Sequence, residues 1–362
     1  MQKVSSERIT ELDIYRALAI LAVVLIHSVS SALYSTSWSS PTFKFYLLLD
    51  QFCRFSVPLF VGLSGYTLTL RYKNNFINAG GFFRRRVLRL MPWYLFWSAV
   101  IFLYIRYSVF WIGAQYFPLW KVIFLGKADY HLYFVPMILQ LYVLFPFLIF
   151  LVKKWGKWLL VPFFLVEMFL YFVLSEFAAG RIALPILLND QQQYLFFGTW
   201  IFYFVLGILL AFDNKLVSFV KKYKLYFLTI LFLVFCWEVF NTFTLLNSLG
   251  DLTLATRSTR IPVLIYATFF YLTVTAGVNY FNFLPGKLYR LLVGIGQRSY
   301  VTYLLHTIPL RVFGSYIGPT SLQNTLLLFV LTVLTADYLA QISLNCARYI
   351  HVKFLYRRVE EI

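Results

Sequence analysis

The stretch LDIYRALAILAVVLIHSVSSAL, residues 12–33, decides the class of fold. It is apolar almost throughout and is interrupted by Asp13, Arg16 and His27. A helix needs about 20 mostly apolar residues to cross the hydrocarbon core of a bilayer. We therefore predict a transmembrane helix here. The segment before it, Met1–Glu11, is polar, and no small-residue cleavage site follows the helix, so we expect the helix to be retained rather than removed as a signal peptide.

The composition extends this conclusion to the whole chain. Of its 362 residues, 61% are hydrophobic and 13% are charged, whereas a soluble domain is about 45–50% apolar and about 25% charged. A compact soluble fold could not bury so much apolar surface. We predict an all-α, polytopic membrane protein with a single transmembrane domain over residues 1–362 and about ten spans, at residues 12–33, 47–70, 90–112, 132–152, 157–174, 195–212, 225–246, 261–281, 299–317 and 323–346.

The cations predict the orientation of these spans. The net charge of +18 would suggest a nucleic-acid partner in a soluble protein. In a membrane protein, Lys and Arg gather in cytoplasmic loops beside anionic lipid, so we expect membrane lipids and no nucleic acid as partners. With the N-terminus inside, about 22 of the 32 Lys and Arg residues fall in cytoplasmic segments and about 8 fall outside. This split favours an even number of helices with both termini in the cytoplasm.

The cysteines do not indicate a disulfide or metal framework. Cys53, Cys236 and Cys346 lie in apolar stretches without a pairing pattern. We expect them to be small buried hydrophobic residues. No metal-ligand spacing is present, and we expect no bound metal.

Ionisable residues inside a bilayer are costly, so each is a functional hypothesis. Arg16 and His27 are eleven residues apart, which places them on one helix face and about 16 Å apart along the axis. Asp13 lies one turn before Arg16 and can pair with it. The alternative is an interfacial Asp–Arg pair and a structural histidine. Three further acids receive no role from the sequence: Glu167, Glu238 and Asp337.

Two other helix ends carry polar patterns. Arg84, Arg85, Arg86 and Arg89 open the third span, where guanidinium groups near a helix N-terminus suit phosphates, although a lipid-anchoring cluster would look the same. Ser299, Tyr303 and His306 share a face of the ninth span, either as a site or as a hydrogen-bonded seam between helices. His131, at the outer end of the fourth span, is either near the depth of His27 or interfacial.

Taken together, these features resemble the integral-membrane acyltransferase 3 family. The matching motifs occur in the family's order: Leu12-Asp13 through Arg16 to His27, Pro58-Leu59-Phe60 with Ser64-Gly65-Tyr66, Phe83–Pro92 with Arg86 and Arg89, His131-Leu132-Tyr133-Phe134, and Tyr303-Leu304-Leu305-His306. Tyr133 stands where the family usually has Trp. The stretch Phe197–Leu206 is also similar to the intercellular adhesion protein C type of staphylococci.

The resemblance implies transfer of an acyl group, acetyl or succinyl, from cytoplasmic acyl-CoA to a hydroxyl of a surface polysaccharide or glycolipid. Acyl-CoA, with acetyl-CoA as the first candidate, would be a co-substrate rather than a bound cofactor. The other partners would be a carbohydrate acceptor and a polysaccharide synthase, at a bacterial plasma membrane. The alternative is an exporter of a polysaccharide such as poly-N-acetylglucosamine. Inverted repeats would favour a transporter, and we see none in the sequence.

The resemblance also implies residue roles. Arg85, Arg86 and Arg89 would bind the phosphates of CoA. Arg16, Tyr303 and His306 would contact the pantetheine arm and thioester, and His131 would lie on the acceptor side. His27 would be the catalytic residue, acting as a general base or as a covalent acyl carrier.

Overall fold

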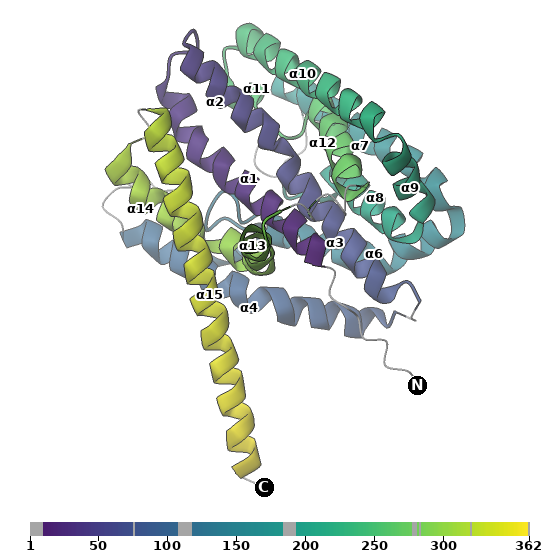
Figure 1. The fold of residues 1–362 in the computed structure, drawn as a ribbon, viewed down its shortest axis with the longest axis vertical. Helices are drawn as coiled ribbons and strands as arrows, with labels where there is room; N and C mark the ends of the chain where they lie inside the picture. The colour runs from purple at the N-terminus through teal and green to yellow at the C-terminus, as the bar shows by residue number, and fades with distance from the viewer. Residues whose placement is uncertain are drawn as a thin grey trace. The chain divides into compact units, whose positions relative to one another are not determined.

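The computed structural model describes residues 10–74, 77–107, 118–183, 193–276, 281, 284–318 and 321–360 (Figure 1). Throughout these ranges the regular structure is helical, without a β-strand. The prediction of an all-α fold is confirmed. Residues 1–9 lie outside the described part of the chain, so retention of the first helix stays a prediction.

The chain divides into two compact units. We call Met1–Tyr46 together with Leu284–Ile362 the terminal unit, and Leu47–Phe283 the central unit. The helix α2 (Pro41–Phe52) contains the boundary between them. The two units are described separately below.

The terminal unit is built around two closely packed helices, α1 (Thr10–Ser35) and α13 (Gly286–Leu305). They pack with α15 (Leu322–Glu360), and α14 (Thr307–Ile317) packs on α13 and α15. Figure 1 shows α13 nearly end-on beside α1 and α15. A Cβ atom added to Gly296 would lie 1.7 Å from the carbonyl oxygen of Asp13. The backbones of α1 and α13 therefore meet at a position that tolerates only glycine, as small residues permit between membrane helices.

The central unit surrounds α8, a short helix that is buried from Ile201 to Ala211. A helix that is apolar on every side belongs in an interior, and α8 packs closely on α3, where a Cβ on Gly207 would lie 2.0 Å from the carbonyl oxygen of Gly62. Figure 1 shows α10 alongside α12. The described 3-10 turns of this unit are η1 (Cys53–Phe55), η2 (Gly156–Leu159) and η4 (Phe197–Thr199). Its described α-helices are α3 (Ser56–Tyr72), α4 (Ala79–Tyr107), α5 (Leu119–Leu125), α6 (Phe134–Trp155), α7 (Leu160–Ala178), α8 (Ile201–Phe212), α9 (Asn214–Lys222), α10 (Lys224–Leu249), α11 (Leu252–Ala255) and α12 (Ile261–Ala276).

Six helical stretches among the described residues are long and apolar enough to cross a membrane. The bent pair Ile201–Phe212 and Lys215–Lys222 would make a seventh. One of the six, Phe134–Ala178, has 45 residues and contains both α6 and α7. At about 1.5 Å per residue it is roughly twice as long as one crossing requires, so it accommodates the two predicted spans 132–152 and 157–174. The count of ten spans and the cytoplasmic placement of both termini stay predictions.

Several predicted spans are broken in the structure. The span 47–70 is divided into α2, η1 and α3, and only residues 201–212 of the span 195–212 form a regular helix. The span 299–317 divides at His306 between α13 and α14. Pro309 explains this break, because it has no N–H to bond to the carbonyl of Leu305 and its ring crowds that carbonyl.

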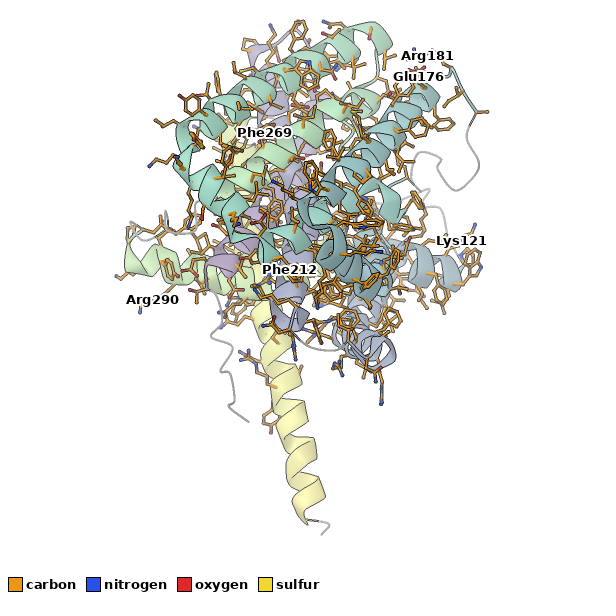
Figure 2. The ribbon with its side chains drawn as sticks, turned by 90° about the vertical axis from the view of Figure 1, so that its right-hand side faces the viewer. Lys121, Glu176, Arg181, Phe212, Phe269 and Arg290 are labelled. Carbon is orange, nitrogen blue, oxygen red and sulfur yellow. The ribbon has the colours of Figure 1, made fainter. Side chains whose placement is uncertain are left out.

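Two surface details complete the fold. Glu176 and Arg181 pair at the end of α7, with Arg181 Nε 2.6 Å from Glu176 Oε2 (Figure 2). Cys53 is buried as predicted, but Cys236 and Cys346 are exposed on α10 and α15. The expectation that these two cysteines are buried was wrong, because an apolar stretch in a membrane helix can face lipid as readily as protein.

Candidate active site

The candidate active site in the terminal unit is a pair of histidines on neighbouring helices. His27 lies in α1, and His306 lies in the break between α13 and α14. Their rings stack with centroids 5.4 Å apart and planes inclined by 23°. His306 is completely buried, whereas His27 is partly exposed. The structure therefore brings together two residues that the sequence placed in separate motifs.

The orientation of His306 is set by the backbone of its own helix. Its Nδ1 lies 2.7 Å from the carbonyl oxygen of Tyr303. A carbonyl oxygen can only accept a hydrogen bond, so Nδ1 carries the proton. In the neutral ring the lone pair then belongs to Nε2. His306 is thus held in one tautomer and one position, and its ring face supports the ring of His27.

The remaining predicted groups of α13 are also buried here. Tyr303 is 5% exposed, and its ring centroid lies 5.9 Å from that of His306. Ser299 is buried one turn earlier. Tyr303 reaches His306 through its backbone carbonyl and its ring, so the predicted shared face is present.

The predicted pairing of Asp13 with Arg16 is confirmed. Arg16 Nη1 donates to Asp13 Oδ1 at 2.7 Å. Asp13 is fully buried, while the Arg16 side chain is 30% exposed. Because α1 is continuous over Thr10–Ser35, the expected separation of about 16 Å between Arg16 and His27 along one face holds.

The arginine cluster lies in the central unit and begins further into its helix than the sequence suggested. We expected the run to open the third span, but α4 begins at Ala79. Asn78 Oδ1 accepts from the N–H of Gly81 at 3.0 Å, as an N-cap does. The side chains of Arg84, Arg85, Arg86 and Arg89 therefore project from the second and third turns.

These arginines differ in their surroundings. Arg84, Arg85 and Arg89 are exposed. Arg86 is half-buried, donates to the Tyr72 hydroxyl at 3.5 Å and lies 5.4 Å from the Phe82 ring centroid. Its Nε is buried without a hydrogen-bond partner among the described residues. Exposed guanidinium forks around one anchored arginine can bind phosphate oxygens in pairs.

His131 also belongs to the central unit, in the turn before α6. It is buried, and its Nδ1 lies 3.6 Å from Asp129 Oδ2. Asp129 Oδ1 in turn accepts from the N–H of Tyr130 at 2.8 Å. This arrangement holds His131 in place beside a carboxylate, and its assignment to the acceptor side stays a prediction.

The three acids without predicted roles all have partners. Asp337 binds Arg298 in a fork, with Arg298 Nε and Nη2 at 2.8 and 2.6 Å from its oxygens. Glu167 accepts from the N–H of Phe202 at 2.9 Å. Glu238 pairs with Arg260 at 2.6 Å. The sequence shows each acid in an apolar helix, but it does not show a partner 22 to 39 residues away.

A polar network around Glu238 escaped the sequence analysis altogether. It joins Asp50, Gln51, Arg54, Glu238, Thr242 and Arg260 in the central unit. The sequence pattern that could have indicated this network is the spacing of four residues between Asp50 and Arg54 and between Glu238 and Thr242. This spacing places the two members of each pair on one helix face.

Comparison with known proteins identifies the family of the chain. No curated protein and no solved structure shows significant similarity to the chain. The model of the acyltransferase 3 family, described as an acyltransferase domain, matches residues 9–340. The match covers both units and includes the histidine pair and the arginine cluster. The chain belongs to the acyltransferase 3 family of membrane acyltransferases.

Proposed function

We propose that this protein transfers an acyl group, acetyl in the first instance, from cytoplasmic acyl-CoA to a hydroxyl of a surface polysaccharide or glycolipid. Membership of the family supports acyl transfer. The observation that carries the assignment of the site is the stack of His27 on the tautomerically fixed His306. A single imidazole could be structural, but a partly exposed imidazole supported by a second, oriented one is arranged for proton transfer.

In the proposed reaction, His27 takes the proton of the acceptor hydroxyl while that oxygen bonds to the thioester carbonyl carbon. The bond from this carbon to sulfur then breaks, and the CoA thiolate receives the proton from the His27 imidazolium. Acylated acceptor and CoA leave, and His27 is neutral again. In a two-step variant, His27 first takes the acyl group itself and then passes it to the acceptor.

The donor is proposed to bind through the arginine cluster of α4. Arg86 is anchored on Tyr72 and Phe82, while Arg85 and Arg89 are exposed beside it. CoA carries several phosphates, which suit planar guanidinium groups. Lipid phosphate could bind the same groups, so the experiment must separate a soluble donor from a membrane anchor.

The test uses inside-out vesicles that contain the protein and receive acetyl-CoA labelled in the acetyl group. We expect label in a membrane-associated product that mild alkali releases, as it does an ester, and we expect no label with His27→Gln. Acid-quenched protein is analysed by mass spectrometry, where an acetyl group on His27 would favour the two-step variant. Label that stays in acetyl-CoA while a glycan crosses the membrane would refute acyl transfer and favour export.

A further inference from the structure

A second polar centre, which the acyl-transfer chemistry above does not use, lies inside the central unit. Arg260 Nη2 donates to Glu238 Oε1 at 2.6 Å and to Gln51 Oε1 at 2.8 Å. Gln51 Nε2 donates to Asp50 Oδ2 at 2.6 Å, and Asp50 also binds Arg54. The chain of contacts thus runs unbroken between residues of α2, η1, α10 and the start of α12. We call it the Glu238 network.

Most of the network is deeply buried, and two residues at its edge are partly exposed. Asp50, Gln51, Glu238 and Thr242 are each 2% exposed or less. Arg54 and Asn241 are partly exposed, and each also binds a neighbour in the network: Arg54 Nη1 donates to Ser258, and Arg260 Nη1 donates to Asn241 Oδ1. The network is therefore not closed off completely from its surroundings.

Glu238 has an unused acceptor in the interior of the network. Its Oε1 receives bonds from Arg260 and Thr242, but its Oε2 is buried without a hydrogen-bond partner among the described residues. Leaving a buried carboxylate oxygen unbonded costs free energy. Buried ion pairs are also poor stabilisers compared with apolar packing. A purely structural role therefore explains neither the unbonded Glu238 oxygen nor the buried ion pair of Glu238 with Arg260. An ionisable group at membrane depth is instead a candidate for a functional role.

Aromatic rings line the same region. The Tyr133 and Tyr194 ring centroids lie 5.5 Å apart, and Trp200 follows Tyr194 at 6.5 Å. Thr259, which directly precedes Arg260, donates to Oε1 of Gln193 at 2.8 Å, and Gln193 directly precedes Tyr194. Tyr194 therefore lies beside the network. Tyr133 and Tyr194 are both partly exposed.

The chemistry of these groups selects a class of ligand. Two carboxylates, Asp50 and Glu238, balance the guanidinium groups of Arg54 and Arg260 within the network. The buried Arg257, whose carbonyl oxygen accepts from Arg260 Nε at 3.0 Å, adds a third cation beside it, so a strong cation is disfavoured. The free Glu238 oxygen requires a donor, and the amide of Asn241 offers both donor and acceptor. A molecule rich in hydroxyl groups meets these requirements, because each hydroxyl both donates and accepts. The apolar C–H face of a sugar ring also packs on an aromatic ring.

The position of the network separates it from the arginine cluster. Arg54 lies in η1, two residues before α3 begins, whereas Tyr72, the last residue of α3, contacts Arg86. The 17 residues of α3 span about 25 Å. The two polar centres of the central unit thus lie at opposite ends of one helix, as donor and acceptor sites for substrates from opposite membrane faces would.

We propose that the Glu238 network and the tyrosines beside it bind a glycosyl unit of the acceptor, remote from the hydroxyl that reacts. Binding energy from such a remote unit can hold an extended acceptor in place. The purpose of this site rests on the proposed acyl transfer, but its binding of sugar does not require catalysis.

The experiment measures binding directly with full-length protein in detergent or nanodiscs. Saturation-transfer NMR is recorded with three soluble probes, cellotetraose, chitotetraose and maltotetraose. We expect saturable binding of at least one probe, and at least tenfold weaker binding with Glu238→Gln and with Asn241→Ala. The matched control is Thr244→Ala on the exposed face of α10, where Thr244 bonds only to its own helix, and its affinity should equal that of the wild type.

The outcomes are distinct. Unchanged binding in both variants, or no binding of any of the three probes to the wild type, would overturn the proposal. If Glu238→Gln does not fold, Asn241→Ala decides, since it removes a single contact to Arg260. Sugar binding that depends on the network without acyl transfer in vesicles would refute the proposed function alone. Acyl transfer without such binding would refute this inference alone.

Discussion

The replacement Gly296→Ala tests whether the close approach of α1 and α13 positions the histidine pair. The added Cβ would lie 1.7 Å from the Asp13 carbonyl oxygen, where ordinary contacts begin near 3.4 Å. The helices must therefore separate locally by about 1.7 Å, because backbone atoms cannot rotate away as a flexible side chain would. Alanine in a helix is favoured over glycine by about 1 kcal/mol. Overpacking of this kind costs about 1–3 kcal/mol, so the clash outweighs that gain.

The expected result is a loss of turnover that exceeds the loss of stability. If only half of the separation reaches His27 and His306, the catalytic geometry changes by nearly 1 Å, and a misplacement of about 1 Å can cost about 100-fold in rate. We expect acyl transfer to fall about 10- to 100-fold. Acyl-CoA affinity should fall less than turnover, because the arginine cluster proposed to hold the CoA phosphates belongs to the central unit.

The assay compares acyl transfer in vesicles, acyl-CoA affinity and the thermal unfolding midpoint. Gly314→Ala in α14 is the matched control, because a Cβ there meets no atom within 4 Å. It should leave transfer unchanged and slightly raise stability. Transfer by Gly296→Ala within a factor of two of this control would refute the reasoning that the α1–α13 contact sets the active geometry.

The remaining predictions concern the histidine pair, the arginine cluster and the orientation of the protein in the membrane. His27→Gln should abolish transfer while acyl-CoA still binds, since a general base contributes about 10²–10⁴-fold. Near-wild-type transfer by folded protein would make His27 structural, and the catalytic assignment would pass to His306 or His131. Arg86→Ala and Arg89→Ala should each weaken acyl-CoA binding, measured by isothermal titration, by about 1.5–3 kcal/mol per lost charged hydrogen bond. Lysine at either position should restore the affinity only in part. Unchanged affinity in both alanine variants would favour lipid anchoring. A cysteine introduced at Leu88, which is 61% exposed, should react with impermeant maleimide in inside-out vesicles only, and labelling from outside intact cells would contradict the orientation.

Much of the site was predictable because its signals are local. The helical periodicity of residues 12–33 places Arg16 and His27 on one face, and the pairing of Asp13 with Arg16 follows from their spacing of three residues. The family motifs indicated His306 and the arginine cluster. These patterns depend on neighbours within two or three turns of one helix, which a sequence displays directly.

The helix boundaries were predictable only in part. Hydropathy marks an apolar stretch but not a break inside it, so the division of 299–317 at His306 was missed although Pro309 signals it. The start of α4 at Ala79 was missed because Arg84–Arg89 is too polar to be counted as membrane-spanning. Helix formation continues past the apolar boundary wherever caps such as Asn78 satisfy the backbone.

By itself the sequence determined that this is a helical membrane protein of a recognisable acyltransferase kind, with His27 and the arginine cluster as its first candidates. Only the tertiary structure decided which helix faces meet. In lipid, apolar residues are stable on any face of a helix, so hydropathy does not identify the packed side. Gly296 against Asp13, His27 against His306 and the Gln51–Arg260 contact, 209 residues apart in the chain, arise from packing between distant segments. Such contacts have no local periodicity, and for that reason the Glu238 network became visible only when the helices were placed together.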